Sequence, residues 1–131
     1  MPQLKPNGKR LNGRGSGWIA RPLRLALYLR DGFACQYCGR DLHAAPPREV
    51  TLDHLVPQCR GGTHEPSNLV TACLACNSRR QHQPWFRYAP EGAVLRIRRA
   101  RRRVPNVKLA RALIRGEVSR GEALAQTGRI R

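Results

Sequence analysis

The sequence predicts an α+β fold in which a small strand–loop–strand–helix unit, closed by two pairs of cysteines, precedes a basic, mainly helical C-terminal extension. Three observations carry this prediction. Cys-x-x-Cys pairs occur at Cys35/Cys38 and at Cys73/Cys76, two short apolar runs lie between the pairs, and the second pair leads into a polar stretch without glycine or proline. In a chain of 131 residues the core is small, and such cores commonly need a metal or disulfides to hold them together.

Turn and capping residues mark the individual elements. The expected elements are, in chain order, a helix at 21–30, strands at 50–52 and 69–71, a helix at 74–83 and a helix at 107–115. Pro22 suits a first helical turn, and Asp31-Gly32 supplies the end of that helix. The segment 54–67 is a long loop for so small a domain, and such loops are usually functional.

The C-terminal extension carries two helix-capping patterns. Asn106 is placed to cap a helix whose apolar face would hold Val107, Ala110, Leu113 and Ile114, with Leu109 off to the side. Ser119 and Glu122 have capping-box spacing before a further apolar run. The chain is therefore divided into a disordered basic arm at 1–20, the cysteine-containing unit at 21–88 and a basic helical extension at 89–131.

The formal charge of +17 is unevenly distributed. Residues 1–24 contain six Lys/Arg and no acidic residue, residues 25–86 six Arg against five acidic residues, and residues 87–131 thirteen Lys/Arg against three Glu. The basic charge thus flanks the cysteine unit. Such a field attracts polyanions, nucleic acid first and an acidic membrane second, but no basic stretch has the apolar face of an interfacial helix. No apolar run is long enough to span a membrane, and the basic N-terminus lacks the apolar region of a secretory signal.

The cysteine spacing indicates a structural zinc. Each Cys-x-x-Cys turn supplies two thiolates to one side of a tetrahedral ion, so Cys35, Cys38, Cys73 and Cys76 form a complete ligand set. The alternative is four buried apolar thiols. Because thiolate sites of this kind belong to reducing compartments, the cytoplasm is the expected location. The fifth cysteine, Cys59, has no partner at this spacing and is expected to be a loop thiol.

Groups suited to phosphodiester hydrolysis lie between the cysteine pairs and directly after the second pair. A histidine can take a proton from water near neutral pH, and a carboxylate with an amide oxygen can hold a hard divalent ion. His54, Asp53 and Asn77 are these groups, with Asn77 expected in the first turn of the helix after the second cysteine pair. Neighbours on a strand point to opposite faces, so Asp53 and His54 can serve one phosphate only if the strand ends or twists there.

The ordered motif Asp53-His54, Pro57, Gly61-Gly62, Asn68-Leu69 and Cys-x-x-Cys-Asn77 resembles the HNH endonuclease family of ββα-metal nucleases. The match covers about residues 21–84. The resemblance implies two antiparallel strands and a helix around one catalytic divalent ion. It implies His54 as general base, Asp53 and Asn77 as ligands of the ion, which would be Mg²⁺ or another divalent metal, and Asn68 as the residue that braces the loop and orients His54. Some members carry a further histidine where this chain has Gln81.

Basic side chains are the expected contacts to nucleic acid. Arg79 and Arg80 would reach phosphate from the helix, and the dense arginine run would contact the DNA backbone; this run comprises Arg96, Arg98, Arg99, Arg101, Arg102 and Arg103. The other histidines, His43, His64 and His82, are expected at the surface. The aromatic residues Trp85, Phe86 and Tyr88 are expected to pack the extension onto the core rather than stack on bases.

The sequence therefore predicts a metal-dependent HNH endonuclease that hydrolyses DNA, expected to be duplex, with sequence specificity either low or supplied by a partner protein. One site would make one nick. A non-catalytic zinc-stabilised module that binds nucleic acid is the alternative from another class, since it needs the cysteines and arginines but has no use for Asp53 and His54. A nuclease directed at RNA is a further alternative.

Overall fold

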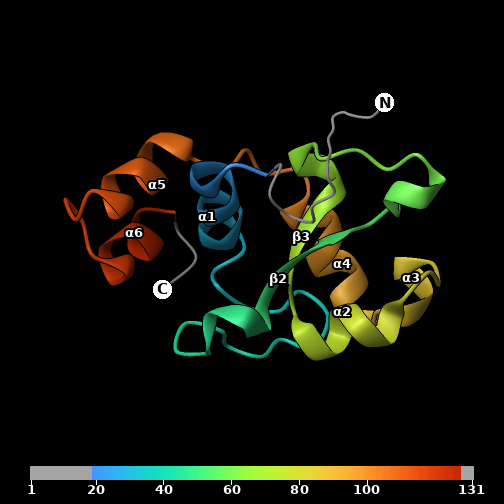
Figure 1. Cartoon of the computed structure of the whole chain (residues 1–131). Coiled ribbons are helices and arrows are strands. Elements are labelled where there is room, and N and C mark those ends of the chain that lie inside the picture. Colours follow the sequence, from blue (N-terminus) through green and yellow to red (C-terminus); the bar gives the residue numbers. More distant parts are fainter. Residues whose placement is uncertain (1–18, 128–131) are drawn as a thin grey trace.

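The computed structural model describes residues 19–127, as six helices, a two-stranded sheet and short 3₁₀ turns (Figure 1). Residues 1–18, which hold nearly all of the expected basic arm, and residues 128–131 lie outside the described residues. The predicted α+β class is confirmed. None of the helices in the described range is long and apolar enough to cross a membrane.

The two strands and the helix after them form the expected ββα unit. Strand β2 (Val50–His54) pairs antiparallel with β3 (Leu69–Cys73), Val50 opposite Cys73 and His54 opposite Leu69. Both strands extend two residues beyond the predicted ends. Helix α2 (Leu74–Arg80) follows β3 directly and is three residues shorter than predicted. It ends there because Gln81 adopts φ 51°, and the chain then turns back so that the Gln83 N–H donates to the Arg80 carbonyl at 3.1 Å.

Helix α1 (Arg21–Arg30) has the predicted bounds and covers the free edge of β3. Asp31 Oδ2 accepts the Thr71 N–H at 2.8 Å, and the Arg30 guanidinium donates to the Leu69 carbonyl at 2.6 Å. Arg30 and Asp31 also pair with each other and are both buried. Since an open strand edge would present unpaired backbone groups, this ion pair closes the sheet on that side.

The extension consists of four further helices: α3 (Trp85–Tyr88), α4 (Glu91–Ala100), α5 (Val107–Ile114) and α6 (Arg120–Gln126). Both predicted caps are confirmed. The Asn106 side chain accepts the Leu109 N–H at 2.9 Å, and Ser119 forms a capping box with Glu122. Much of the arginine run lies on α4, whose buried face is made of small and aliphatic residues.

Two main cores link these elements. One surrounds the cysteine pairs and includes Ala93 and Ile97 of α4. The other joins α1 to α5 and α6, which lie beside α1 in Figure 1, and it includes Leu109, predicted to lie off the apolar face but only 7% exposed. The boundary between residues 88 and 89 stays a prediction, and residues on both sides of it pack into the first core.

Candidate functional site

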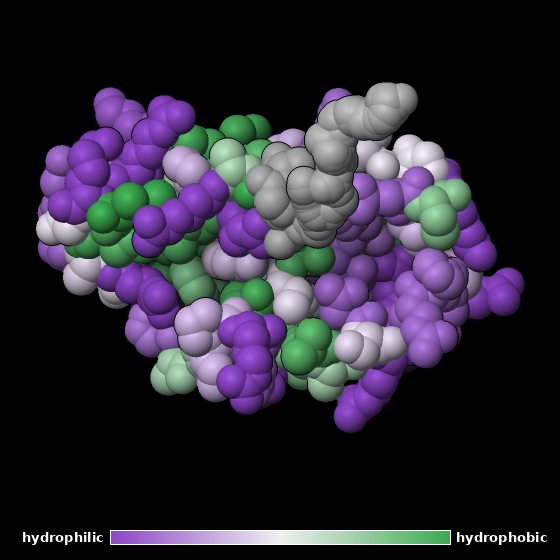
Figure 2. All heavy atoms as spheres, viewed as in Figure 1, coloured by the Kyte–Doolittle hydropathy of each residue, from purple (hydrophilic) through white to green (hydrophobic). Residues whose placement is uncertain are grey.

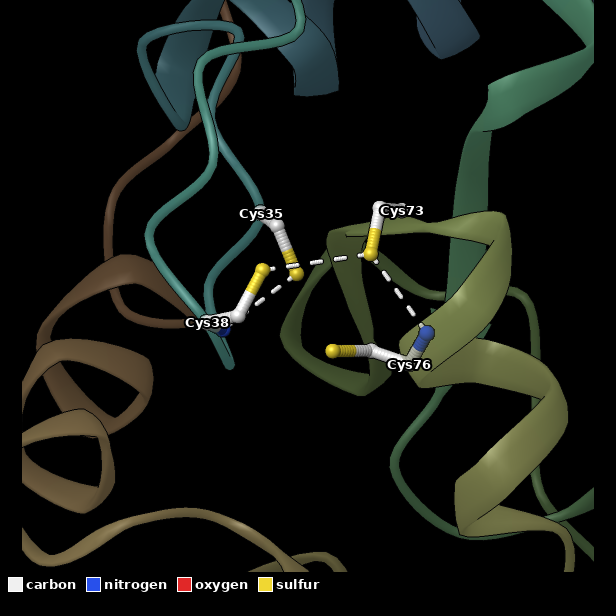
Figure 3. Close-up of side chains that lie close together, drawn as sticks. All are labelled: Cys35, Cys38, Cys73 and Cys76. Atoms are coloured by element: carbon white, nitrogen blue, oxygen red, sulfur yellow. Dashed lines mark hydrogen bonds between the residues drawn. The ribbon is translucent and has the colours of Figure 1, made fainter.

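The four predicted cysteine ligands converge on one point (Figure 3). Their sulfur atoms all lie within 4.8 Å of one another, and Cys38 Sγ lies 3.9 Å from Cys73 Sγ. A tetrahedral zinc with bonds of about 2.3 Å requires sulfur separations of about 3.8 Å. The backbone N–H of Cys38 points to Cys35 Sγ at 3.5 Å, and that of Cys76 to Cys73 Sγ at 3.4 Å. This geometry is compatible with zinc.

The chemistry of the cluster also suits a dication. Burial raises the pKa of the Cys35 thiol, and it raises that of Cys76 to about 12. At Cys73, burial acts in the same direction, but hydrogen bonds from Cys76 outweigh it and the pKa is lowered. Four adjacent thiolates, three of them on buried residues, would repel one another, and a bound dication would offset that repulsion. Cys59 is exposed and takes no part in the cluster; its sulfur lies 3.8 Å from His82 Nδ1.

Asp53 is held inside the protein by two side chains. Its Oδ2 atom accepts from the Arg80 guanidinium at 2.7 Å and from the Tyr37 hydroxyl, and Asp53 is only 6% exposed. Burial raises the pKa of the Asp53 carboxyl, while Tyr37 and Arg80 act to lower it. Within the described residues, the hydrogen bonds and ion pairs of this carboxylate all fall on Oδ2, which leaves Oδ1 as its second ligand atom.

Arg80 serves as an internal support. It is 1% exposed and also donates to the carbonyls of His54, Leu55 and Gln83, at 2.8, 2.5 and 3.0 Å. A guanidinium whose three nitrogens are all bonded to protein oxygens is not available at the surface. The phosphate contact expected of Arg80 from the sequence is therefore not supported by its position, because its side chain turns inward from α2 toward β2.

One face of α2 follows strand β2. Asn77 and Arg80 are three residues apart and so lie on the same side of the helix. Asn77 Nδ2 donates to Thr51 Oγ1 at 3.0 Å and to the Leu52 carbonyl at 3.5 Å. The amide nitrogen of Asn77 is turned toward β2, and within residues 19–127 its side-chain carbonyl oxygen is left as a ligand atom. Asn77 thus contacts the two strand residues before Asp53, and Arg80 contacts Asp53 and the two residues after it.

A hollow of about 480 Å³ brings His54 and Asn77 together. It is bounded also by Arg24 and Arg48, and the strand contributes Val50, Thr51 and Leu52. Asp53 is not among its lining residues, since its buried carboxylate is bonded to Tyr37 and Arg80. Strand β2 remains regular through His54, so the side chains of Asp53 and His54 point to opposite faces. The structure therefore brings two of the three predicted catalytic groups into one hollow and places the third behind the strand, next to Arg80.

His54 has a partner that sequence reasoning missed. Its Nε2 atom lies 2.9 Å from His64 Nδ1, and the two rings meet edge to face. Gln58 Nε2 lies 3.3 Å from the other nitrogen of His64. Burial, then the charge of His64 and then that of Arg80 lower the pKa of His54 below its ordinary value, so its imidazole is neutral near pH 7. His64 was expected to be a plain surface residue, and its position in the loop that returns past the strand end was the only sequence signal.

Asn68 joins the two ends of the long loop. Its side chain accepts the Val56 N–H at 2.8 Å and donates to the carbonyls of Val56 and Thr63, at 3.1 and 2.9 Å. Each of the two glycines in the loop is required at its position for a different physical reason. Gly61 adopts φ 88°, and a Cβ on Gly62 would stand 1.7 Å from the Val56 carbonyl oxygen. The loop therefore packs tightly against the end of β2, where His54 lies.

The other arginines predicted to contact nucleic acid differ in how far the protein holds them. Arg79, Arg96, Arg98, Arg99 and Arg102 are exposed, but Arg96 and Arg101 are also bonded to backbone carbonyls. Arg96 donates to the carbonyls of Gln36 and Tyr37, at 3.0 and 3.1 Å, and Arg101 to that of Ser67 at 2.8 Å. Arg101 and Arg102 share a hollow with Arg98 and Trp85. Arg103 is half-buried.

Comparison with known proteins identifies the segment that holds these groups. Residues 35–83 match the family model described as HNH endonuclease, so the resemblance predicted from the motifs is confirmed for this segment. The match contains both cysteine pairs, both strands, α2 and the loop with His64. Neither the curated proteins nor the solved structures contain a match to the chain. An HNH domain suggests a nuclease or nucleic-acid-binding function.

Proposed function

We propose that this protein is a metal-dependent HNH endonuclease that hydrolyses DNA phosphodiester bonds. The observation that carries the proposal is the shared hollow of His54 and Asn77, at the end of a strand whose Asp53 is fixed by Arg80, inside the segment that matches the family. A module that only binds nucleic acid has no need for a half-buried histidine with a lowered pKa at a strand end.

Asp53 and Asn77 are the proposed ligands of the catalytic divalent ion, Mg²⁺ or a similar metal. Because β2 ends at His54, this proposal requires the Oδ1 atom of Asp53 to reach the hollow of His54 and Asn77 around the end of the strand. One carboxylate oxygen and one amide oxygen form the kind of hard ligand set that such ions prefer. The bonds to Oδ2 of Asp53 would orient Oδ1, just as the bonds of Asn77 Nδ2 would orient its carbonyl oxygen. When bound, the ion would supply stabilisation of the charge on the phosphate and on the leaving oxygen.

His54 is the proposed general base. Because its Nε2 atom is paired with His64, Nδ1 is the nitrogen that would accept a proton from water. The hydroxide formed in this way attacks phosphorus, and the bond between phosphorus and the 3′ oxygen breaks. Asn68 supports His54 indirectly, by fixing the loop that carries His64.

DNA, expected to be duplex, is the proposed substrate. The exposed arginines of α2 and α4, within a chain of formal charge +17, would contact its backbone and would give binding without sequence preference. Sequence specificity would then be low or supplied by a partner protein. Zinc is the proposed ion of the four cysteines, and these thiolates suit a reducing compartment such as the cytoplasm.

A plasmid assay tests this proposal. Supercoiled DNA is incubated with the protein over a titration of Mg²⁺ and Mn²⁺, and a structured RNA is offered in competition. Nicked plasmid that requires added metal supports the endonuclease. Tight binding without cleavage in either metal would instead support the non-catalytic module, and preferential cleavage of the RNA would reassign the substrate.

A further inference from the structure

A second hollow, of about 740 Å³, lies between α1, the start of α6, the C-terminal end of α5 and the loop after the first cysteine pair. Its volume falls within the range of small-molecule sites, about 300–1,000 Å³. Buried apolar side chains form its floor, namely Tyr28, Phe33 and Leu42, which are 8%, 4% and 0% exposed. Figure 2 shows hydrophobic side chains gathered among hydrophilic ones over α1 and α5.

The walls of this hollow are basic. Arg21 and Arg24 come from α1 and Arg120 from α6, and none of its lining residues in the described range is acidic. Arg120 is held in place, since its guanidinium lies 4.3 Å from the centre of the Phe33 ring and donates to the His43 carbonyl at 2.5 Å. The face of the Arg120 guanidinium turned away from Phe33 therefore offers a planar cation in a fixed position. A ligand for this hollow therefore carries negative charge and a flat, weakly polar ring.

The hollow adjoins the proposed catalytic site. Arg24, Pro47 and Val50 line both this hollow and the one that holds His54 and Asn77. Val50 and His54 lie at the two ends of β2, about 13 Å apart at the rise of a strand. That span corresponds to roughly four nucleotides of a stacked DNA strand, at about 3.4 Å each.

We propose that this second hollow binds one unpaired nucleotide of the strand being cut, a few positions from the scissile phosphate. The inference rests on the proposed function for the identity of the strand. The base would stack on the Arg120 guanidinium, which itself lies over the Phe33 part of the floor, and the flanking phosphates would meet Arg21 and Arg24. A paired base cannot reach such a floor, because it is enclosed in the duplex. The preferred substrate is therefore DNA with a mismatch, bulge or single-stranded gap beside the cut.

The test is a binding measurement that does not require cleavage. The full chain carrying His54→Ala is titrated against two fluorescently labelled duplexes, one fully paired and one with a single unpaired thymidine, by anisotropy. Stacking of one base contributes about 1–3 kcal/mol, so the bulged duplex is expected to bind about fivefold tighter or more. The same preference is then measured after Ile114→Trp, which fills the hollow, and after Arg21→Ala.

Arg111→Ala is the matched control, since Arg111 is exposed on α5, lies outside the hollow and carries the same charge as Arg21. The proposal predicts that Ile114→Trp and Arg21→Ala reduce the preference to about twofold or less, with unchanged melting temperatures, while Arg111→Ala keeps it. Equal binding of the two duplexes by the chain that carries only His54→Ala, or a preference for the bulged duplex that survives both further substitutions, overturns the proposal. Plasmid cutting by the unsubstituted protein is scored separately. If the protein cuts DNA without preferring the bulged duplex, only the nucleotide site proposed here is wrong. If it prefers the bulged duplex without cutting DNA, only the proposed nuclease function is wrong.

Discussion

Arg80 is buried beneath strand β2 with its guanidinium 2.7 Å from the Asp53 carboxylate. The same side chain donates to the backbone carbonyls of the two residues after Asp53. One arginine therefore neutralises a buried acid and fixes the end of the strand. The orientation of Asp53 and the backbone of His54 both depend on it.

Replacing Arg80 is expected to destabilise the fold strongly. Arg80→Ala leaves the Asp53 charge buried without its partner, which typically costs about 3–5 kcal/mol. The free energy of unfolding measured by urea denaturation reports this loss. The exposed neighbour Arg79 is the control, and Arg79→Ala should change the free energy of unfolding by no more than about 0.5 kcal/mol. Equal effects of the two substitutions would show that the buried pair contributes little.

The four-cysteine cluster should bind one zinc that stabilises the fold. Cys38→Ser removes one ligand, so zinc content by atomic absorption should fall and the melting temperature should drop, as it should when a strong chelator removes the metal. Cys59→Ser removes a cysteine outside the cluster and should leave both quantities unchanged. A Cys38→Ser protein with full zinc content would rule out this ligand set.

The pH dependence of cleavage should reflect the pairing of His54 with His64. A lowered pKa keeps His54 neutral further into the acid range, so the rate should begin to fall only below the ordinary histidine value of about 6.5. His64→Gln removes the repulsion from the charge of His64, raises the pKa of His54 and should move the acid limb to higher pH. A profile that only decreases in height, with its midpoint unmoved, would assign His64 a structural role.

The exposed arginines of α4 and of the turn after it should set the salt dependence of DNA binding. In a plot of log affinity against log salt, each lost phosphate contact reduces the slope by about 0.9. The triple variant Arg98→Gln, Arg99→Gln, Arg102→Gln should therefore lower the slope by up to about 3. Arg115 is already paired with Glu117 at 2.7 Å, so Arg115→Gln should leave the slope nearly unchanged. An unaltered slope in the triple variant would place the phosphate contacts elsewhere. Substitution is preferable to deletion here, because Ile97 and Ala100 of α4 are fully buried.

Local signals predicted most of the architecture. Three of these signals depend on residues close together in the chain, and each appears in the structure. They are the two Cys-x-x-Cys pairs, the caps at Asn106 and Ser119 and the short apolar strands on either side of the long loop. Strand alternation also indicated that Asp53 and His54 would diverge unless the strand ended or twisted, and β2 continues regularly through both.

Contacts between residues far apart in the chain could not be predicted from the sequence. Tyr37 contacts Asp53 across sixteen positions, and His64 meets His54 across ten. Neither pairing follows from a local period. The sequence predicts a phosphate contact for Arg80, because a polar helix following the second cysteine pair gives no sign of which side faces the strand. Only the packing of α2 against β2 turns that side chain inward.

His54 is the proposed general base for DNA cleavage, and one kinetic comparison tests that role. The direct measurement is the rate of nicking of supercoiled plasmid in Mg²⁺ or Mn²⁺ by the unsubstituted protein, by His54→Ala and by the control His82→Ala, whose histidine is exposed beyond α2. Loss of a general base should lower the rate by about 100-fold or more, while DNA affinity and His82→Ala activity stay within about twofold. Plasmid nicked equally fast by the unsubstituted protein and by His54→Ala would show that His54 is not the general base.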